Sequence, residues 1–175
     1  YGAQWRRWRD CWFGQGMVDQ IRQLVVNLRN EPQSRRHLVS AWNVAEIHMM
    51  SIPPCPFAFQ CMVTNGQLNM HVFVRSWDVF LGAPFDIAEY ALLLCLLCHQ
   101  TNMPIGDLLF SATDVHLYET HVKQADLQLR REPMDLPQFV LQEKVASIDD
   151  YTYLQLRNAI RGYISHPAIK APIAV

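Results

Sequence analysis

The sequence lacks an excess of charge of either sign, and it lacks a long hydrophobic run. Its 15 Lys and Arg residues against 16 Asp and Glu residues give a formal net charge of −1, with a sequence pI near 6.7. This balance does not favour binding to nucleic acid or to a membrane surface. The most apolar run, Tyr90 to Cys98, is too short to span a bilayer, and the first residues carry no apolar signal core. We therefore expect a cytoplasmic protein in which any phosphate site is local.

The sequence also lacks repeats, low-complexity tracts and a disulfide framework. Its five cysteines are odd in number and stand mostly among apolar residues, which suits a reducing compartment. Cys95 and Cys98 have the spacing of a redox or metal pair, but their neighbours are those of a buried helix. We interpret them as two core thiols one turn apart and expect no metal site.

What the sequence does have is enough hydrophobic residues, half of 175, to build a core in a single domain over residues 1–175. Helical spacing and strand-like alternation predict several elements. They are helices over 17–30, 85–98 and 117–131, and strands over 37–42, 57–64, 67–75 and 108–111. Asn65-Gly66 is a hairpin signal, and Pro84 suits the first turn of the buried 85–98 helix. Strands and helices in mixed order indicate an α+β fold.

Seven short motifs follow one another along the chain. They are Tyr1-Gly2-x-Gln4-Trp5-Arg6, Ser34-Arg35-Arg36, Ala41-Trp42-Asn43, Pro54-Cys55, the block from Arg75 to Asp86, Asp114-x-His116-Leu117-Tyr118 and Ala174-Val175. In content and order they resemble the thymidylate synthase family, where a cysteine nucleophile precedes an Arg-Ser-x-Asp-x-x-Leu-Gly-x-Pro-Phe-Asn run. The resemblance implies a mixed sheet packed against a long buried helix, dimerising through the sheet. Because the family pattern is already under way at Tyr1, we expect an N-terminal part of it to be absent.

The resemblance assigns Cys55 as the nucleophile. Pyrimidine C5 is a poor nucleophile, and thiolate addition at C6 turns C5 into an enamine or enolate carbon. Arg75 would stabilise the thiolate and bind the nucleotide phosphate. Outside the motif, a cysteine beside two prolines would be interpreted as a structural thiol.

The resemblance also implies a nucleotide monophosphate site shared between the subunits of a homodimer. Arg35 and Arg36 would reach across the interface to the partner's phosphate, and Ser76 would add a hydroxyl group. His116 and Tyr118 face the same way on an extended segment and would contact the sugar 3′-hydroxyl. Without the motif, these residues would be a surface arginine pair and a polar pair at a strand end.

The implied co-substrate is 5,10-methylenetetrahydrofolate. Asp78, which is also assigned to the nucleotide site, would bind the pterin of the folate. Val175 would close over the folate. The pocket would be lined by Leu81, Gly82 and Phe85. Tyr1 would help a water network to remove the C5 proton.

Asp86 stands where the family run ends in Asn. Uracil offers an N3–H donor and an O4 acceptor, whereas cytosine offers an N3 acceptor and an N4 amino donor, which a protonated carboxyl group complements. We therefore predict conversion of dCMP to 5-hydroxymethyl-dCMP, as in the deoxycytidylate hydroxymethylases of the same family. An Asn could also flip to suit cytosine, so discrimination depends on what orients the side chain. The alternative is an Asp that only caps its helix.

Four other departures from the family pattern lie near the base or its waters. Pro56 replaces a His, Val74 a Gln, Trp77 a small residue, and Ala112-Thr113 a Gly-Gly pair. They suggest a rebuilt water network, as expected if water rather than a folate hydride ends the reaction. The alternatives are a thymidylate synthase acting on dUMP, a methylase acting on dCMP, a CMP 5-hydroxymethylase, and a catalytically silent nucleotide- or RNA-binding relative.

Overall fold

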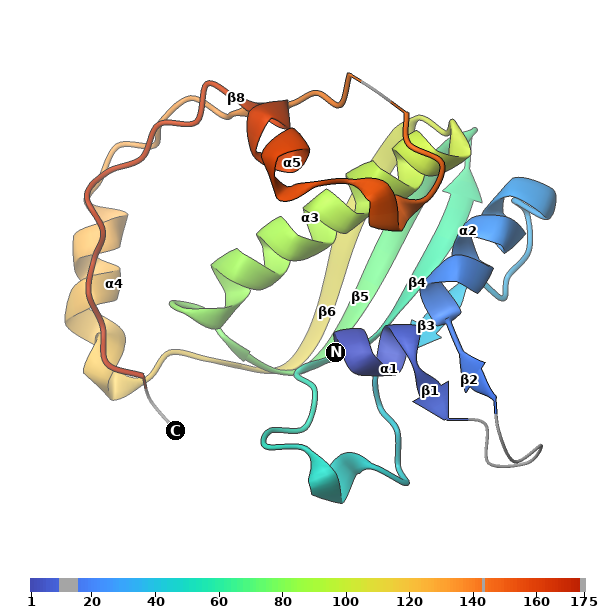
Figure 1. The fold of residues 1–175 in the computed structure, drawn as a ribbon. Helices are drawn as coiled ribbons and strands as arrows, with labels where there is room; N and C mark the ends of the chain where they lie inside the picture. Colours follow the sequence, from blue (N-terminus) through green and yellow to red (C-terminus); the bar gives the residue numbers. More distant parts are fainter. Residues whose placement is uncertain (10–15, 143, 174–175) are drawn as a thin grey trace.

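A four-stranded mixed sheet forms the centre of the protein, whose computed structural model describes residues 1–9, 16–142 and 144–173 (Figure 1). The strands are β3 (Leu38–Ser40), β4 (Pro56–Thr64), β5 (Gln67–Asp78) and β6 (Ile105–His116), side by side in that order. β4 pairs antiparallel with both β3 and β5, while β5 and β6 are parallel. Parallel neighbours need a crossover, and α3 (Gly82–Thr101) provides it. The predicted α+β class with a mixed sheet is confirmed.

The hairpin between β4 and β5 turns at the predicted residues. Asn65 and Gly66 both have positive φ, 53° and 75°, as a two-residue turn that follows the twist of the strands requires. β5 continues past the expected end at Arg75 to Asp78, because its last residues pair with β6 up to Asp78 opposite His116.

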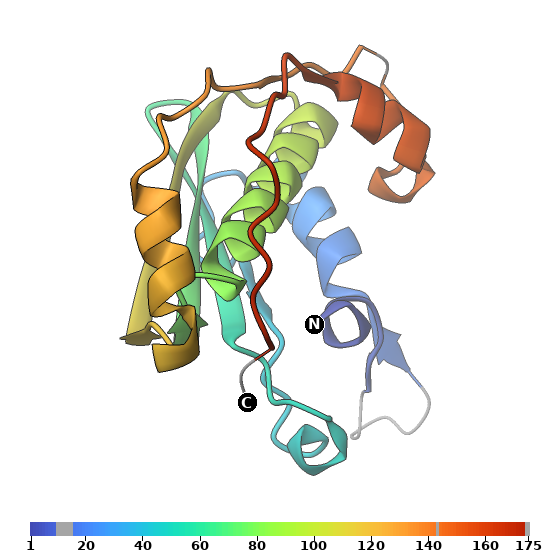
Figure 2. The same ribbon diagram turned by 90° about the vertical axis from the view of Figure 1, so that its left-hand side faces the viewer.

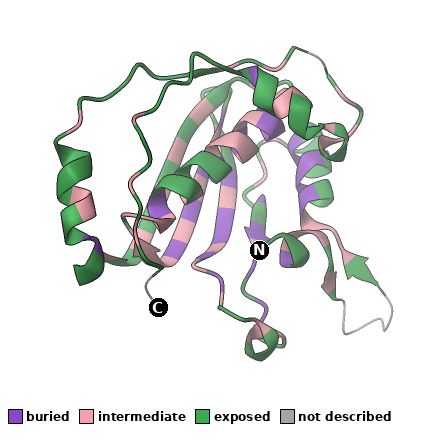
Figure 3. Ribbon diagram, turned by 60° about the vertical axis from the view of Figure 1, so that its left-hand side comes forward, coloured by how far each residue is buried: buried purple, intermediate pink, exposed green. Residues whose placement is uncertain are grey.

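Two helices cover one face of the sheet, α2 (Gln20–Asn30) and α3 (Figure 2). Buried residues, coloured purple in Figure 3, lie on α2, on α3 and on the strands. Leu28 of α2 and Leu97 of α3 are fully buried against Phe59, Met70 and Val72. Burial of this apolar surface is what holds the layers together.

α3 is longer than predicted from residues 85–98. By length and composition alone it could cross a membrane, a test that the core helix of a soluble protein also passes. Here Tyr90, Leu94 and Leu97 pack on the sheet, so its apolar character has a structural explanation.

Neither α2 nor α3 covers the opposite face of the sheet, which we call the open face. Leu38, Gln60, His71 and Leu109 are register partners across the four strands. The adjacent row, Val39, Phe59, Val72 and Phe110, packs in or against the core under the helices. Because side chains alternate along a strand, the first row points the other way, and Leu38 and Leu109 are 52% and 46% exposed.

Short elements surround this core. They are α1 (Gly2–Arg6), β1 (Trp8–Arg9), β2 (Met17–Val18), η1 (Ile47–Met49), η2 (Glu119–His121), α4 (Val122–Leu129), β7 (Gln138–Phe139), η3 (Ile148–Asp150), α5 (Tyr153–Ala159) and β8 (Ile160–Arg161). Two predicted helices were too long. The first begins after Met17–Val18, which pair with β1, at the N-cap Asp19. The second begins only at Val122, because Tyr118 is extended and a 3-10 turn follows it.

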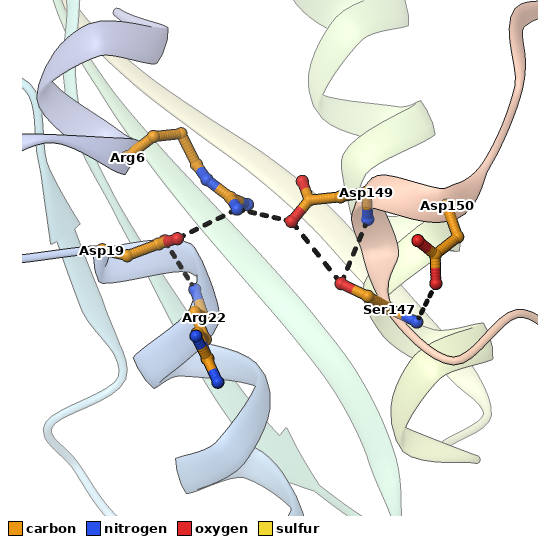
Figure 4. Close-up of polar contacts among 6 residues, drawn as sticks. All are labelled: Arg6, Asp19, Arg22, Ser147, Asp149 and Asp150. Atoms are coloured by element: carbon orange, nitrogen blue, oxygen red, sulfur yellow. Dashed lines mark hydrogen bonds and ion pairs between the residues drawn. The ribbon is translucent and has the colours of Figure 1, made fainter.

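Arg6 ties distant parts of the chain together (Figure 4). Its Nη2 lies 2.9 Å from Asp19 Oδ2 at the start of α2 and 2.6 Å from Asp149 Oδ2 in η3. Asp19 also caps α2 by accepting from Arg22 N. The C-terminal segment is held separately, beside α4, where Arg131 donates to Pro167 O.

Candidate active site

Cys55 and Arg75 meet at the start of the β4–β5 hairpin. Pro56 pairs with Val74, so the residues just beyond that pair face each other, and Arg75 N donates to Cys55 O at 2.9 Å. The Arg75 side chain donates to the carbonyls of Pro53 and Pro54 at 2.7 and 3.0 Å, and its Nη2 lies 3.6 Å from Cys55 Sγ. The guanidinium therefore fixes the loop and places a positive charge beside the sulfur.

Arg75 keeps donors for a further partner. Within residues 1–9, 16–142 and 144–173 its side-chain bonds use Nε and Nη2, whereas a guanidinium has five N–H donors. The Nη1 donors remain for an anion such as the predicted nucleotide phosphate.

Asp86 accepts a hydrogen bond from Trp77, one of the four departures from the family pattern. Trp77 Nε1 donates to Asp86 Oδ2 at 2.8 Å. The N-cap position of α3 is Leu81, without a side-chain cap bond. The alternative that Asp86 only caps its helix is therefore wrong, and the side chain is oriented by an indole.

Three ionisable groups lie near Asp86, namely Tyr1, Glu89 and Tyr90. Burial raises the pKa of Asp86, and the bond from Trp77 partly offsets that rise. Burial also raises the pKa of Tyr1, and the charges of the nearby Cys55, Asp86 and Glu89 raise it further. For Glu89, burial and then the nearby Asp86 raise the pKa of the carboxyl group. Each of these shifts makes the protonated form of the oxygen acid easier to populate than in water, which is the direction that a carboxyl group donating to a base needs.

Glu89 was missed from the sequence. A signal was present, since Glu89 lies three residues after Asp86 and such residues share one face of a helix. The residues around it in the 85–98 helix are mostly apolar, and this pattern indicates a core helix rather than a site.

Asp78 organises the turn into α3. Its two carboxylate oxygens accept from Phe80 N at 3.0 Å and Leu81 N at 3.3 Å. Each oxygen retains acceptor capacity for a pterin. Beside this turn, Phe85 is 75% exposed, so an apolar surface is present where the resemblance places the folate. Val175, predicted to close that pocket, lies outside the described residues.

His116 and Tyr118 lie together at the end of β6. Their ring centroids are 4.9 Å apart in an edge-on arrangement. His116 is the register partner of Asp78, and the nearby Asp114 is that of Ser76. The structure thus brings the predicted sugar, phosphate and pterin contacts to one end of the β5–β6 pair.

Arg35 and Arg36 lie away from Cys55 within one chain. Both are exposed in the turn before β3, and Arg35 O accepts from Gln60 Nε2 at 3.1 Å. The extended stretch from Cys55 to Gln60, at about 3.3 Å per residue, separates them by roughly 15 Å. These two predicted phosphate ligands are not brought to the site of their own chain.

The other described thiols differ from Cys55 in environment. Burial raises the pKa of Cys61 and of Cys98 to about 12, and it also raises the pKa of Cys95. Such thiols are poor nucleophiles and poor ligands at neutral pH. In residues 1–9, 16–142 and 144–173, no three His, Cys, Asp or Glu side chains are grouped to hold a metal ion.

One comparison with known proteins bears on this arrangement. A family model described as "Thymidylate synthase" matches residues 1–175, the whole chain. The match accounts for the order of the motifs and for the meeting of Cys55 with Arg75.

Proposed function

Since this chain belongs to the thymidylate synthase family, we propose that it converts dCMP to 5-hydroxymethyl-dCMP with 5,10-methylenetetrahydrofolate as co-substrate. The coarser activity, folate-dependent transfer of a one-carbon unit to C5 of a pyrimidine nucleotide, follows from the family. Cytosine as the base and hydroxymethyl as the product are the specific parts of the proposal.

The reaction begins with addition of the Cys55 thiolate to C6 of the base. Asp86 gives its proton to N3, which stabilises the adduct and leaves C5 nucleophilic. The bound folate supplies the one-carbon unit, which becomes bonded to C5. Tyr1 helps to remove the C5 proton, tetrahydrofolate leaves unoxidised, and water adds to the exocyclic methylene carbon. Release of Cys55 from C6, with return of the N3 proton to Asp86, restores the aromatic ring.

The observation that carries the cytosine assignment is the environment of Asp86. Its pKa is raised by burial, and Tyr1 and Glu89, whose pKa values are also raised, lie near it. An ionised Asp86 would set an acceptor against O4 of uracil, whereas a protonated one donates to N3 of cytosine. A mismatch of this kind in a closed site costs roughly 1–3 kcal/mol.

The hydroxymethyl assignment is supported by a row of apolar residues next to Cys55. Pro56, Val74 and Ala112 are register partners across β4, β5 and β6. They are three of the positions where the family pattern has His, Gln and Gly. The polar groups near Asp86 are instead Tyr1 and Glu89, which supports a water network different from that of a thymidylate synthase.

We also propose a homodimer formed through the open face of the sheet. Leu38, Met62 and Leu109 expose apolar surface, and the His71 and Phe73 rings lie 4.4 Å apart. The distance of Arg35 and Arg36 from Cys55 supports the same assembly, because a second copy could supply them to this site.

The test of the base assignment is Asp86→Asn. The ratio of kcat/KM for dCMP to that for dUMP should fall, because an amide cannot protonate N3. An unchanged ratio would mean that Asp86 does not read the base. The test of the product is dihydrofolate absorbance: stoichiometric dihydrofolate would indicate a methylase, and activity on neither nucleotide nor on CMP would indicate a silent relative.

A further inference from the structure

Trp77 holds Asp86 through a hydrogen bond from its indole nitrogen. Its indole stacks on Phe110, with ring centroids 5.0 Å apart and 19° between the planes. Phe110 belongs to the layer packed against the core, so the indole plane is fixed from behind. Its Nε1 then reaches Asp86 Oδ2 at 2.8 Å.

The chemistry of the indole fixes the state of each carboxyl oxygen. An indole N–H only donates, so Oδ2 must accept. When Asp86 is neutral, the better acceptor is its carbonyl oxygen, and the bond from Trp77 therefore places the proton on Oδ1. The carboxyl group presents one donor and one acceptor in a fixed order.

We propose that Trp77 is a positioning residue for base recognition: it makes Oδ1 the donor to N3 of cytosine and leaves Oδ2 to accept from the N4 amino group. This inference rests on the cytosine function proposed above. Oδ2 has two lone pairs, so it serves Trp77 and the amino group together. Uracil meets the opposite order, with N3–H against the Oδ1 hydroxyl and O4 against Oδ2.

The same bond has a consequence for Asp86→Asn. In that variant Trp77 favours the amide oxygen at the Oδ2 position, which leaves the amide NH₂ facing N3. That is the cytosine order again. The variant alone should therefore lose only part of its preference, and full reversal toward dUMP should require loss of the indole donor as well.

The experiment compares wild type, Trp77→Phe, Asp86→Asn and the double variant by the dCMP to dUMP ratio of kcat/KM. Trp77→Phe should lower the ratio about tenfold, the value of one lost hydrogen bond to a carboxyl group. The double variant should have the lowest ratio and prefer dUMP. Equal ratios for Asp86→Asn and the double variant, with no change in Trp77→Phe, would overturn the proposal.

A second readout separates positioning from packing. The titratable groups near Asp86 are Tyr1, Glu89 and Tyr90, and all remain in Trp77→Phe. Loss of the Trp77 donor should raise the pKa of Asp86, so the alkaline limb of kcat/KM for dCMP should move to higher pH. Phe110→Leu is the matched control, because it removes the stacking partner and keeps the indole donor. Because the indole donor is still present, the limb should move less than it does in Trp77→Phe, and an equal shift would contradict the proposal.

Measurements on the wild-type protein distinguish failure of the proposed function from failure of the Trp77 inference. If dCMP is not turned over, the proposed function fails, while the Trp77 inference is still tested by NMR. The indole ¹H–¹⁵N signal of Trp77 should follow the titration of Asp86. If Trp77→Phe does not fold, that titration decides, and an indole signal that is constant with pH overturns the inference.

Discussion

At the scale of single residues, the reactivity of the thiols depends on their surroundings. Cys55 has a guanidinium 3.6 Å from its sulfur, whereas burial raises the pKa of Cys61 and Cys98 to about 12. Because the thiolate is the nucleophile, iodoacetamide at neutral pH should alkylate Cys55 at least about tenfold faster than these two. Peptide mass spectrometry over time measures the three rates, and dUMP or dCMP should protect Cys55. Equal rates would contradict the assignment of the nucleophile.

Glu89 gives a prediction about stability and pH. Its pKa is raised in the folded protein, first by burial and then by Asp86. The folded state therefore binds the proton more tightly, and stability falls as pH rises through the interval between the unfolded and folded pKa values. Glu89→Gln removes this loss, so its melting temperature should exceed that of wild type at pH 7. Below about pH 4 the two should converge. A wild-type protein that is more stable than the variant at pH 7 would contradict the prediction.

Part of the site at this scale could be read from the sequence and part could not. Cys55 and Arg75 were predictable from the family motifs. Their contact was not, because the register that the Asn65-Gly66 turn sets would place Cys55 opposite Ser76, and a register shift between Pro56 and Ala58 brings it to Arg75. The bond from Trp77 to Asp86 was not, because it joins a strand end to a helix start across a turn whose geometry is set by Asp78. The sequence predicts that Glu89 lies on the same helix face as Asp86, but it does not predict that Glu89 is partly buried.

At the scale of elements, α1 and α2 depend on contacts with a segment far along the chain. Arg6 bridges Asp19 and Asp149 and is partly exposed, with a side-chain exposure of 31%. Exposed ion pairs are weak individually, and a shared pair contributes roughly 1 kcal/mol. Arg6→Gln should lower the free energy of unfolding by about that amount in urea denaturation. Arg130→Gln, which breaks the exposed pair with Asp126 within α4 and the following turn, is the control with a smaller effect. Equal losses would contradict the bridging role.

The limits of elements were harder to predict than their existence. β5 and α3 both ran past their expected ends, because tertiary contacts extend them: pairing with β6 in the first case and packing on the sheet in the second. Residues 117–121 have a helical pattern in sequence yet turn before α4. There His121 is fully buried and its Nε2 donates to Pro172 O at 2.7 Å, a contact that no local pattern encodes.

At the scale of the whole molecule, the proposed dimer predicts complementation between inactive chains. If Arg35 and Arg36 serve the partner's site, Cys55→Ala and an Arg35→Ala, Arg36→Ala double variant should each be inactive or nearly so alone. Unfolding and refolding them together forms heterodimers in which one site has both lesions and the other has none. Activity should return in the mixture, at roughly a quarter of the wild-type value because half of the chains form heterodimers with one intact site each. The matched control refolds each variant with itself.

No recovery, despite mixed dimers shown by mass spectrometry, would contradict sharing of the site. Leu109→Glu on the open face offers an independent check, because a buried charge without a partner is costly at an interface. It should yield monomers in sedimentation analysis. A dimer of unchanged stability would mean that the open face is not the interface.

The most direct test of the central claim is the mass of the product formed from dCMP and from dUMP, side by side, with methylenetetrahydrofolate. The account predicts a product from dCMP that carries one added formaldehyde unit, with tetrahydrofolate left unoxidised and dUMP a much poorer substrate. Conversion of dUMP to dTMP with stoichiometric dihydrofolate, and no product from dCMP, would contradict it.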